Sequence, residues 1–309
     1  MPKFKKKTTE QIQREIASKI IRQMESAGTN WLRSWAVPQG DQPTSMSTGK
    51  PYNGINWLIL GIERAAKGYA SGQWATYKQW ESRGAQVRRG EKGTQVVLYK
   101  PIVIKEKQED GTTEEKNVRL LRSFTVFNAD QVDGYEAPTC DDMPNYKDGN
   151  PETLFDTIAK NVECEVRHDN IASAFCEGRG AYVNMPFCNQ FDSPEGYAAT
   201  GFHELVHWTG ATSRLDRESF TKYARMRAEE ELVAELGAAM LCGVTGVSPE
   251  PREDHATYLN SWLASIKKDP KAIFRAAAKA SAASTYIVET SGFFKWQEVQ
   301  LNADERIAA

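Results

Sequence analysis

Two histidines and a glutamate lie close together in the segment GFHELVHWTG, which covers residues 201–210. His203, Glu204 and His207 form the pattern H-E-x-x-H. Residues four apart share one face of a helix, so both imidazoles can bind a single metal ion. Glu204 would lie beside that ion, where its carboxylate can act as general acid and base toward a water molecule. The pattern therefore predicts one divalent metal ion with hydrolytic chemistry, with zinc expected first and manganese as the alternative.

A zinc site that keeps one position open for water needs a further protein ligand. The segment AEEELVAELGAAMLC, residues 228–242, is rich in helix-forming residues and offers several carboxylates. We expect Glu231 to bind the ion and Glu235, one helical turn later, to accept the free N–H of a ligating histidine. Glu230 and Glu235 remain alternative ligands. The competing interpretations are a helix with two surface histidines and a solvated acidic helix face.

Two further features could hold or polarise a substrate. Tyr223 lies between the two metal-binding segments, and its phenol could donate a hydrogen bond to a developing oxyanion. Its alternative role is structural, in the core or at its rim. Residues 181–184 are expected to form an edge strand, to which an extended peptide could add. The alternative is an ordinary edge strand without a partner.

Helical and strand periodicity predicts the elements that would carry these residues. Residues 8–27 place apolar side chains at helical spacing between a threonine cap and Gly28. Residues 84–99 alternate like two strands around a glycine-rich turn, and residues 100–105 continue the second strand. Residues 118–127 return as a strand after a polar hairpin loop over residues 107–116. Further helices are expected over residues 55–67, 152–161, 254–268 and 272–288, and further strands over residues 164–168 and 174–176.

Length and composition indicate an ordinary globular protein of two domains, since 309 residues with 40% hydrophobic content can form two cores. The five cysteines are scattered and contain no C-x-x-C, which favours reduced thiols in the cytoplasm and argues against a cysteine-zinc site. No apolar run reaches the length of a membrane helix, and the basic start lacks the apolar region of a signal peptide. We therefore expect no membrane partner.

Charge is unevenly distributed along the chain. Residues 1–100 carry 17 Lys and Arg against 7 Asp and Glu, whereas the remainder carries 22 against 34. Such a basic segment suits an anionic partner, and its interleaved aromatic residues suit single-stranded nucleic acid, whose bases stack on rings. The alternative is that most of these tryptophans form the core. The residues expected to contact DNA are Trp35, Lys50, Tyr52, Trp74, Lys78, Arg88, Arg89 and Lys92, with the three aromatic rings exposed in loops.

Several short blocks resemble one known family. HELVHWTG and EELVAELGAA, together with GKPYNGIN, GAQVRRGEKGTQVVLYK and FTVFNADQVDG, are similar to the ArdC antirestriction proteins of conjugative plasmids. The resemblance implies an α+β protein. Residues 1–135 would form a mixed α/β domain that binds single-stranded DNA, and residues 152–309 a zincin-like metallopeptidase domain with the H-E-x-x-H motif. The polar, proline-containing residues 136–151 would link the two domains.

The same resemblance implies a function. An ArdC-like protein would protect incoming plasmid DNA from restriction in the cytoplasm of a recipient bacterium. Its metal domain could be a zinc-dependent endopeptidase that cleaves a host protein, which leaves the substrate unknown. Two alternatives stay open at this point. The chain could be a peptidase for DNA–protein crosslinks, or a coating protein without catalysis, such as the related module found on plasmid primases.

Overall fold

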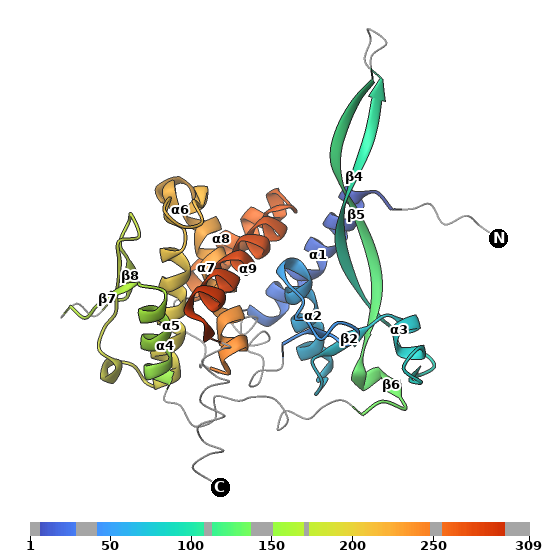
Figure 1. The fold of residues 1–309 in the computed structure, drawn as a ribbon, viewed down its shortest axis with the longest axis horizontal. Coiled ribbons are helices and arrows are strands. Elements are labelled where there is room, and N and C mark those ends of the chain that lie inside the picture. The colour runs from blue at the N-terminus through green and yellow to red at the C-terminus, as the bar shows by residue number, and fades with distance from the viewer. Residues whose placement is uncertain are drawn as a thin grey trace.

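A computed structural model describes residues 7–28, 42–107, 113–136, 151–169, 173–247 and 255–293. It contains both helices and short sheets, which confirms the expected α+β class. The elements before residue 136 lie on one side of the molecule and those after residue 151 lie on the other (Figure 1). Among these residues, no helix is long and apolar enough to cross a membrane.

The first part of the chain builds two helices on a small sheet. Helix α1 (Thr9–Ala27) starts at a capping box, in which the Thr8 hydroxyl accepts from the Gln11 N–H at 3.2 Å. Helix α2 (Gly54–Lys67) ends at Gly68, which takes the left-handed conformation at φ 67°. The sheet has the strand order β1 (Thr44–Ser45), β2 (Gln73–Ala75), β5 (Thr113–Asn128), β4 (Thr94–Lys107).

Strands β4 and β5 form a long antiparallel hairpin that projects from this half (Figure 1). Their pairing runs from Thr94 opposite Val126 to Lys107 opposite Thr113. The predicted strands and polar loop therefore correspond to this hairpin, although the loop itself, residues 108–112, lies outside the described residues. Strand β3 (Gln86–Val87) pairs instead with β6 (Val132–Asp133), beside the short helix α3 (Tyr77–Glu81).

The second part of the chain is mainly helical. Helix α4 (Pro151–Asn161) and a three-stranded sheet precede the helices that follow. The strands are β7 (Glu165–Arg167), β8 (Phe175–Cys176) and β9 (Tyr182–Asn184), and the helices are α5 (Pro194–Trp208), α6 (Glu218–Thr221), α7 (Tyr223–Thr245), α8 (His255–Lys268) and α9 (Ala272–Ser291). Helix α7 contains a kink at Met226, which has non-helical backbone angles.

The expectation that residues 181–184 form an edge strand is wrong. Strand β9 pairs in parallel with β7 on one side and antiparallel with β8 on the other. It is therefore the central strand of its sheet, and both of its backbone hydrogen-bonding edges are already used. The alternating pattern of a strand shows which side chains share a face, but it does not show how many neighbours the strand has. Within this sheet, a peptide could add only to β7 or β8.

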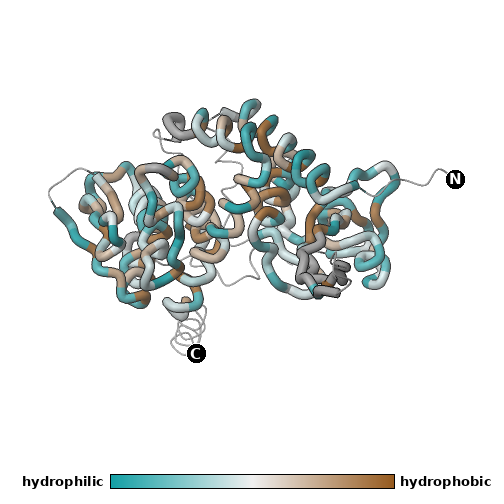
Figure 2. The backbone as a smooth tube through the Cα atoms, turned by 90° about the horizontal axis from the view of Figure 1, so that it is seen from above, coloured by the Kyte–Doolittle hydropathy of each residue, from teal (hydrophilic) through white to brown (hydrophobic). Residues whose placement is uncertain are grey.

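One apolar core continues through both halves. It joins Ile16 and Ile20 of α1, Trp57 of α2, and Trp262 and Ile273 of the C-terminal helices, all of which are buried. Helix α1 contacts α8, and α2 contacts α9. Figure 2 shows apolar segments within both halves and on the helices where they meet. The half that carries the H-E-x-x-H motif is therefore packed directly against the basic half.

Helices α5 and α7 approach each other closely at Gly237. A Cβ added at this residue would lie 2.7 Å from Cγ2 of Val206 on α5. A similar close approach occurs at Gly201 of α5, where an added Cβ would lie 2.5 Å from the ring of Phe155 on α4. Without side chains, these two glycines let three helices pack tightly around the motif.

We expect Gly237→Ala to lower the free energy of unfolding by about 1–3 kcal/mol, since the extra methyl overpacks a rigid contact with Val206. Urea unfolding of the full chain measures this change. The matched control is Gly61→Ala within α2, where an added Cβ meets nothing within 4 Å. That control should be neutral or stabilising by up to about 1 kcal/mol, since alanine favours helix. Equal unfolding midpoints for Gly237→Ala and the wild type would contradict the close-packing argument.

Candidate metal centre

Helix α5 holds the H-E-x-x-H residues on a buried face. The helix begins at Ser193, whose hydroxyl accepts from the Gly196 N–H at 3.0 Å, and Pro194 occupies its first turn. His203, Glu204 and His207 are 5%, 7% and 6% exposed. The interpretation as two surface histidines is thus contradicted, because both imidazoles lie in the interior.

Helix α7 brings a third donor to these histidines. The Nε2 atoms of His203 and His207 lie 3.2 Å apart. Glu231 Oε2 lies 3.4 Å from His203 Nε2, and Glu231 Oε1 lies 3.8 Å from His207 Nε2. Glu231 is 6% exposed, so the acidic face of α7 is not solvated here. Among the described residues, these three form the group whose donor atoms could hold one metal ion.

The spacing of these donor atoms fits a small divalent ion. Zinc–nitrogen bonds of about 2.0–2.1 Å at tetrahedral angles place neighbouring donors about 3.3 Å apart. The distances of 3.2 and 3.4 Å match that edge, and 3.8 Å is slightly longer. Two Nε2 atoms at this separation can share a proton or bind one cation between them. The donor set of two nitrogens and one carboxylate is one that zinc and manganese both accept.

Each histidine also contacts a carboxylate on the side away from the proposed ion. Glu235 Oε1 lies 3.2 Å from Nδ1 of His203, and Glu230 Oε1 lies 3.2 Å from Nδ1 of His207. Such contacts set the tautomer and orientation of a metal-ligating imidazole, leaving Nε2 free for the metal. Glu235 thus lies beside the outer nitrogen of His203 without forming a hydrogen bond to it, and its expected role as acceptor stays a prediction. Glu230 and Glu235, the alternative ligands, both lie on the outer nitrogens.

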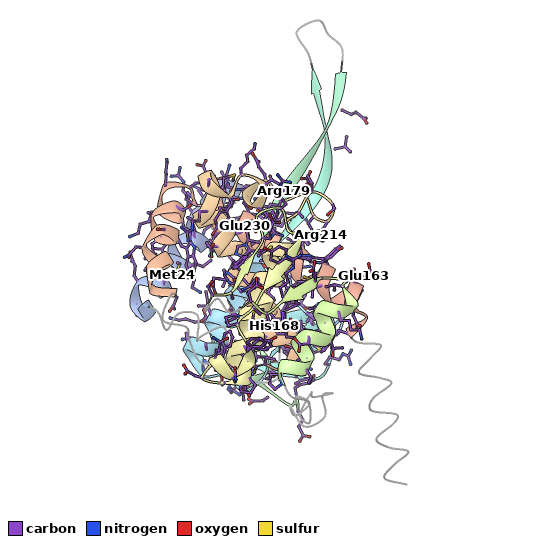
Figure 3. All side chains as sticks on the ribbon, turned by 90° about the vertical axis from the view of Figure 1, so that its left-hand side faces the viewer. Met24, Glu163, His168, Arg179, Arg214 and Glu230 are labelled. Atoms are coloured by element: carbon purple, nitrogen blue, oxygen red, sulfur yellow. The ribbon has the colours of Figure 1, made fainter. Side chains whose placement is uncertain are left out.

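Glu230 is the centre of a buried network that the sequence did not reveal. It is fully buried and accepts from Arg217 Nη2 at 2.6 Å and from Ser219 Oγ at 2.5 Å. Figure 3 labels Glu230 among the side chains of the molecule. Arg217 also donates to Thr209 Oγ1 at 2.8 Å and to the Val206 carbonyl at 2.7 Å, at the end of α5. The loop between the helices therefore fixes the second histidine through Glu230. No local pattern marks Arg217 or Ser219 for this role.

Charge in this cluster is strongly unbalanced. All of the carboxylates buried among the described residues belong to it, namely Glu204, Glu230, Glu231 and Glu235. Burial opposes the protonated form of His203, but the charge of Glu235 and a hydrogen bond to Glu231 outweigh it and raise its pKa to about 10. Burial likewise opposes ionisation of Glu230, yet hydrogen bonds from His207 and Arg217 lower its pKa to about 2. The site therefore favours positive charge at its centre.

Tyr223 lies at the rim of the cluster, before the kink of α7. Its hydroxyl donates to Glu231 Oε1, and its ring centroid lies 6.1 Å from that of His207. The side chain is 36% exposed. In this arrangement the phenol orients a ligand carboxylate, and it lies close enough to the cluster to reach a bound substrate.

The aromatic residues expected to contact DNA are placed differently from the prediction. Trp74 was expected to be exposed, but it is fully buried in a cluster with Leu60, Val96 and Val126. Its place in β2, between β1 and β5, turns the ring into the core, so it cannot stack on a base without unfolding that cluster. Tyr52 is half-buried against the same cluster. Trp35 lies outside the described residues.

The basic residues are mostly available at the surface. Lys50, Lys78, Arg89 and Lys92 are exposed. Arg88 is also exposed, but its guanidinium donates to the Val132 carbonyl at 3.3 Å and lies 3.4 Å from Asp133 Oδ1 and 3.5 Å from Glu91 Oε1. These contacts stabilise the loop and leave the Arg88 guanidinium less available to a phosphate than the other basic side chains.

Comparison with known proteins finds a matching family for each half of the chain. Residues 153–279 match a zincin-like metallopeptidase family, and residues 10–127 match the N-terminal domain of the anti-restriction factor ArdC. The metal-free crystal structure of antirestriction protein ArdC from plasmid R388 superposes with a TM-score of 0.77 at 35% identity, covering 91% of this chain and 98% of that one. The chain belongs to the ArdC antirestriction family. The Mn(II)-bound form of the R388 protein superposes with a TM-score of 0.74 at 34% identity.

Two further relatives show where ArdC-like chains occur. The uncharacterized protein y4eC of Sinorhizobium fredii is 34% identical over 280 residues, which cover 88% of this chain and 90% of that protein. A DNA primase TraC of Escherichia coli is 33% identical over 297 residues, which cover 89% of this chain but 27% of the primase. The Mn(II)-bound ArdC relative, the zincin-like domain and the donor cluster together support a divalent metal ion in this chain.

We expect Glu235→Ala to weaken metal binding about 10–100-fold, because His203 would lose the acceptor that orients its ring. Competition with a fluorescent chelator, using zinc and manganese separately, measures the affinity. The matched control is Glu81→Ala, which removes an exposed carboxylate of α3 outside the cluster and should leave the affinity unchanged. An unchanged affinity in Glu235→Ala would show that the contact does not support the ligand.

Proposed function

We propose that this ArdC-family protein binds single-stranded DNA through residues 1–135 and carries a metal-dependent peptidase site in residues 152–309, joined by a linker over 136–151. It would protect incoming conjugative DNA from restriction in the cytoplasm of a recipient bacterium. The observation that carries the catalytic part is the buried arrangement of His203, His207 and Glu231 around one point, with Glu204 on the same helix. A site that only stabilised the fold would not require this additional carboxylate.

The residues divide the chemistry among them. His203, His207 and Glu231 would hold the ion, zinc or manganese, which when bound supplies Lewis-acid activation of water and of a peptide carbonyl. Glu204 follows His203 directly, so its carboxylate can take a proton from the attacking water and later donate it to the leaving amine. Tyr223 can donate its hydroxyl to the carbonyl oxygen as negative charge develops there. The substrate of this proposed metalloendopeptidase would be a host protein.

The DNA-binding part rests on charge. Lys50, Lys78, Arg89 and Lys92 are exposed in a half whose sequence is basic, and phosphates bind such surfaces with release of counterions. The family model that matches residues 10–127 supports this assignment. Of the aromatic residues first expected to stack on bases, Tyr52 is the described one that keeps partial exposure.

A second candidate function is favoured by the TraC relatives. Because nearly the whole chain aligns with about a quarter of a DNA primase, the same pair of domains also occurs in a protein that acts on DNA during priming. In that case the chain would coat single strands without catalysis. A peptidase for DNA–protein crosslinks is the other alternative. It would need the same Glu204 and the same DNA binding, and it differs only in its substrate.

We expect Glu204→Gln to keep metal and DNA binding while lowering peptide hydrolysis about 10²–10⁴-fold, since the amide cannot accept the proton of water. Protection of an incoming plasmid in a restricting recipient strain should fall in parallel. The control is Glu195→Gln, in the first turn of the same helix, which should behave as the wild type. Full protection by Glu204→Gln would contradict the peptidase mechanism and favour coating of single strands.

We expect the double variant Arg89→Ala, Lys92→Ala to weaken binding of an oligonucleotide and to reduce the salt slope by about 1 for each phosphate that is no longer neutralised. Fluorescence anisotropy at several salt concentrations measures both quantities. Lys160→Ala, which removes an exposed charge of α4 in the other half, is the control and should leave the slope unchanged. An unaltered slope in the double variant would exclude this loop as a phosphate-binding site.

A further inference from the structure

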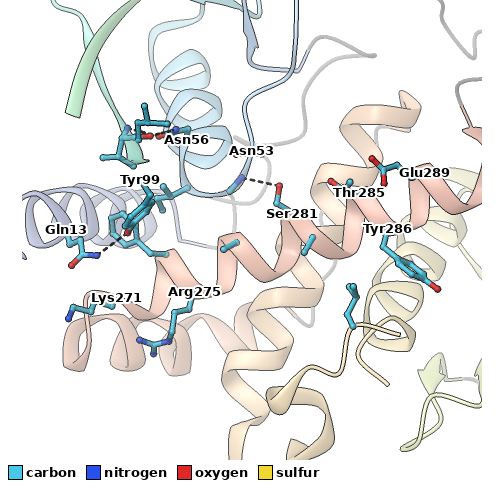
Figure 4. A pocket seen from close by; sticks show the side chains of 18 residues that line it. Gln13, Asn53, Asn56, Tyr99, Lys271, Arg275, Ser281, Thr285, Tyr286 and Glu289 are labelled. Carbon is cyan, nitrogen blue, oxygen red and sulfur yellow. Dashed lines mark hydrogen bonds between the residues drawn. The ribbon is translucent and has the colours of Figure 1, made fainter. Parts of the chain in front are cut away.

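A long groove lies between the two halves of the molecule, away from the metal cluster. One wall is α9, and the other is formed by the start of α2 together with residues 97–99 of β4 (Figure 4). Its volume is about 960 Å³. The residues of α9 that line it run from Lys271 to Glu289, which corresponds to a length of ~27 Å at 1.5 Å per residue.

Small side chains keep the α9 wall open. Ala278 and Ala282 are exposed, and Ser281 accepts from the Gly54 N–H at 3.1 Å, which ties α9 to the start of α2. On the other wall, Leu98 and Tyr99 are 53% and 40% exposed. The groove thus has an open wall of small α9 side chains and an exposed phenol ring, that of Tyr99, at one end. Tyr286 lies toward the other end (Figure 4).

Positive charge gathers at the Tyr99 end. Lys271 and Arg275 line the groove there, and Arg275 is held by Asp269 at 2.7 Å. The N-terminus of α2 faces the groove without a side-chain cap and without an acidic residue in its first turn. Although the Gly54 N–H donates to Ser281, the dipole of α2 adds partial positive charge to that of the two cations. Among the described residues that line the groove, the one carboxylate is that of Glu289, which lies at the opposite end.

An independent feature at the same end is an unpartnered amide oxygen. Gln13 of α1 is 6% exposed and lines the groove, where its Nε2 donates to the Tyr99 hydroxyl at 3.2 Å (Figure 4). Its Oε1 is buried and has no hydrogen-bond partner among the described residues. Buried polar atoms without a partner are rare and need an explanation, and a ligand that donates a hydrogen bond to this oxygen would supply one. Amino groups of nucleobases are such donors.

We propose that this groove between the halves binds a segment of single-stranded DNA, with phosphates at the Lys271–Arg275 end and a base stacked on Tyr99. The inference rests on the proposed function and adds a second contact region to it, since none of the basic residues named there lines the groove. An anionic ligand fits the cations and the uncapped helix, an aromatic one fits the exposed ring, and the length suits the ~4 nucleotides of a short single-strand site. A peptide would use backbone partners along the edge of β4, but at Val97 both backbone groups are already bonded to the Asn56 side chain, at 2.7 and 2.9 Å.

A strand bound in this groove would bridge the two halves of the molecule. It would contact α2 and β4 of the basic half and α9 of the metal-binding half at the same time. The buried face of α9, which includes Ala276, Ala280 and Ala283, packs in the core beside α7, the helix that carries Glu231. The same helix would therefore hold DNA on one side and support the metal centre on the other.

The test is to fill the groove without changing charge. Ala282→Trp places an indole on the α9 wall of the groove. The control, Ala264→Trp, makes the same exchange at an exposed position of α8 outside the groove. We expect Ala282→Trp to weaken binding of a fluorescent dT12 oligonucleotide to the full chain by roughly tenfold, and Ala264→Trp to have no effect. Urea unfolding confirms that both variants fold. Lys271→Glu reverses an exposed charge and should weaken binding by a similar factor. This variant replaces Ala282→Trp as the test if the tryptophan variant unfolds.

The outcomes separate this inference from the proposed function. Wild-type affinity in both Ala282→Trp and Lys271→Glu would overturn the groove as a DNA site, while binding by the wild type would leave the proposed function intact. No binding of dT12 by the wild type would overturn both. Normal DNA binding together with slower peptide cleavage in Ala282→Trp would also overturn the proposal and assign the groove to a peptide instead.

Discussion

The metal centre depends on how closely α7 can approach α5. Its donor atoms come from two helices, and they reach separations of 3.2–3.8 Å because Gly237 has no side chain where α7 meets Val206. Gly201 lets Phe155 pack on α5 in the same way. Helix axes held apart by an extra methyl group would place Glu231 beyond reach of both histidines. Packing, and not the motif alone, makes these residues one site.

Electrostatics sets a second constraint on the same site. Four carboxylates are buried together, and transfer of charge from water to an interior is unfavourable unless each group has partners. Arg217 neutralises Glu230, and Arg217 and Ser219 both donate hydrogen bonds to it. The imidazole of His203 lies beside Glu231 and Glu235, and that of His207 lies beside Glu230. The cluster still carries excess negative charge, because Arg217 and the two imidazoles provide fewer positive charges than these four carboxylates provide negative ones. A divalent cation supplies what is missing, which is why the arrangement suits a metal.

The two halves form a continuous body. Apolar residues from α1 and α2 share a core with α8 and α9, and the groove runs along the line where the halves meet. The positive end of that groove combines residues from both sides of the chain. Charge counted along the sequence placed the basic character in the first hundred residues, but both cations among the described residues that line the groove, Lys271 and Arg275, come from α9 of the other half. A partner that bridges the halves would be sensitive to this charge.

The sequence by itself determined the family and the α+β class, and it named the candidate residues that the structure brings together, because H-E-x-x-H and the glutamates of α7 are local patterns with helical spacing. It also predicted most helices and the β4–β5 hairpin, whose periodicity is strong. Only the tertiary structure decided that Trp74 is buried, that β9 is central in its sheet, and that Glu230 accepts from Arg217 and contacts the second histidine. These features depend on neighbours far away in sequence. A local pattern shows which side chains share a face, but the packing of other segments decides what that face meets.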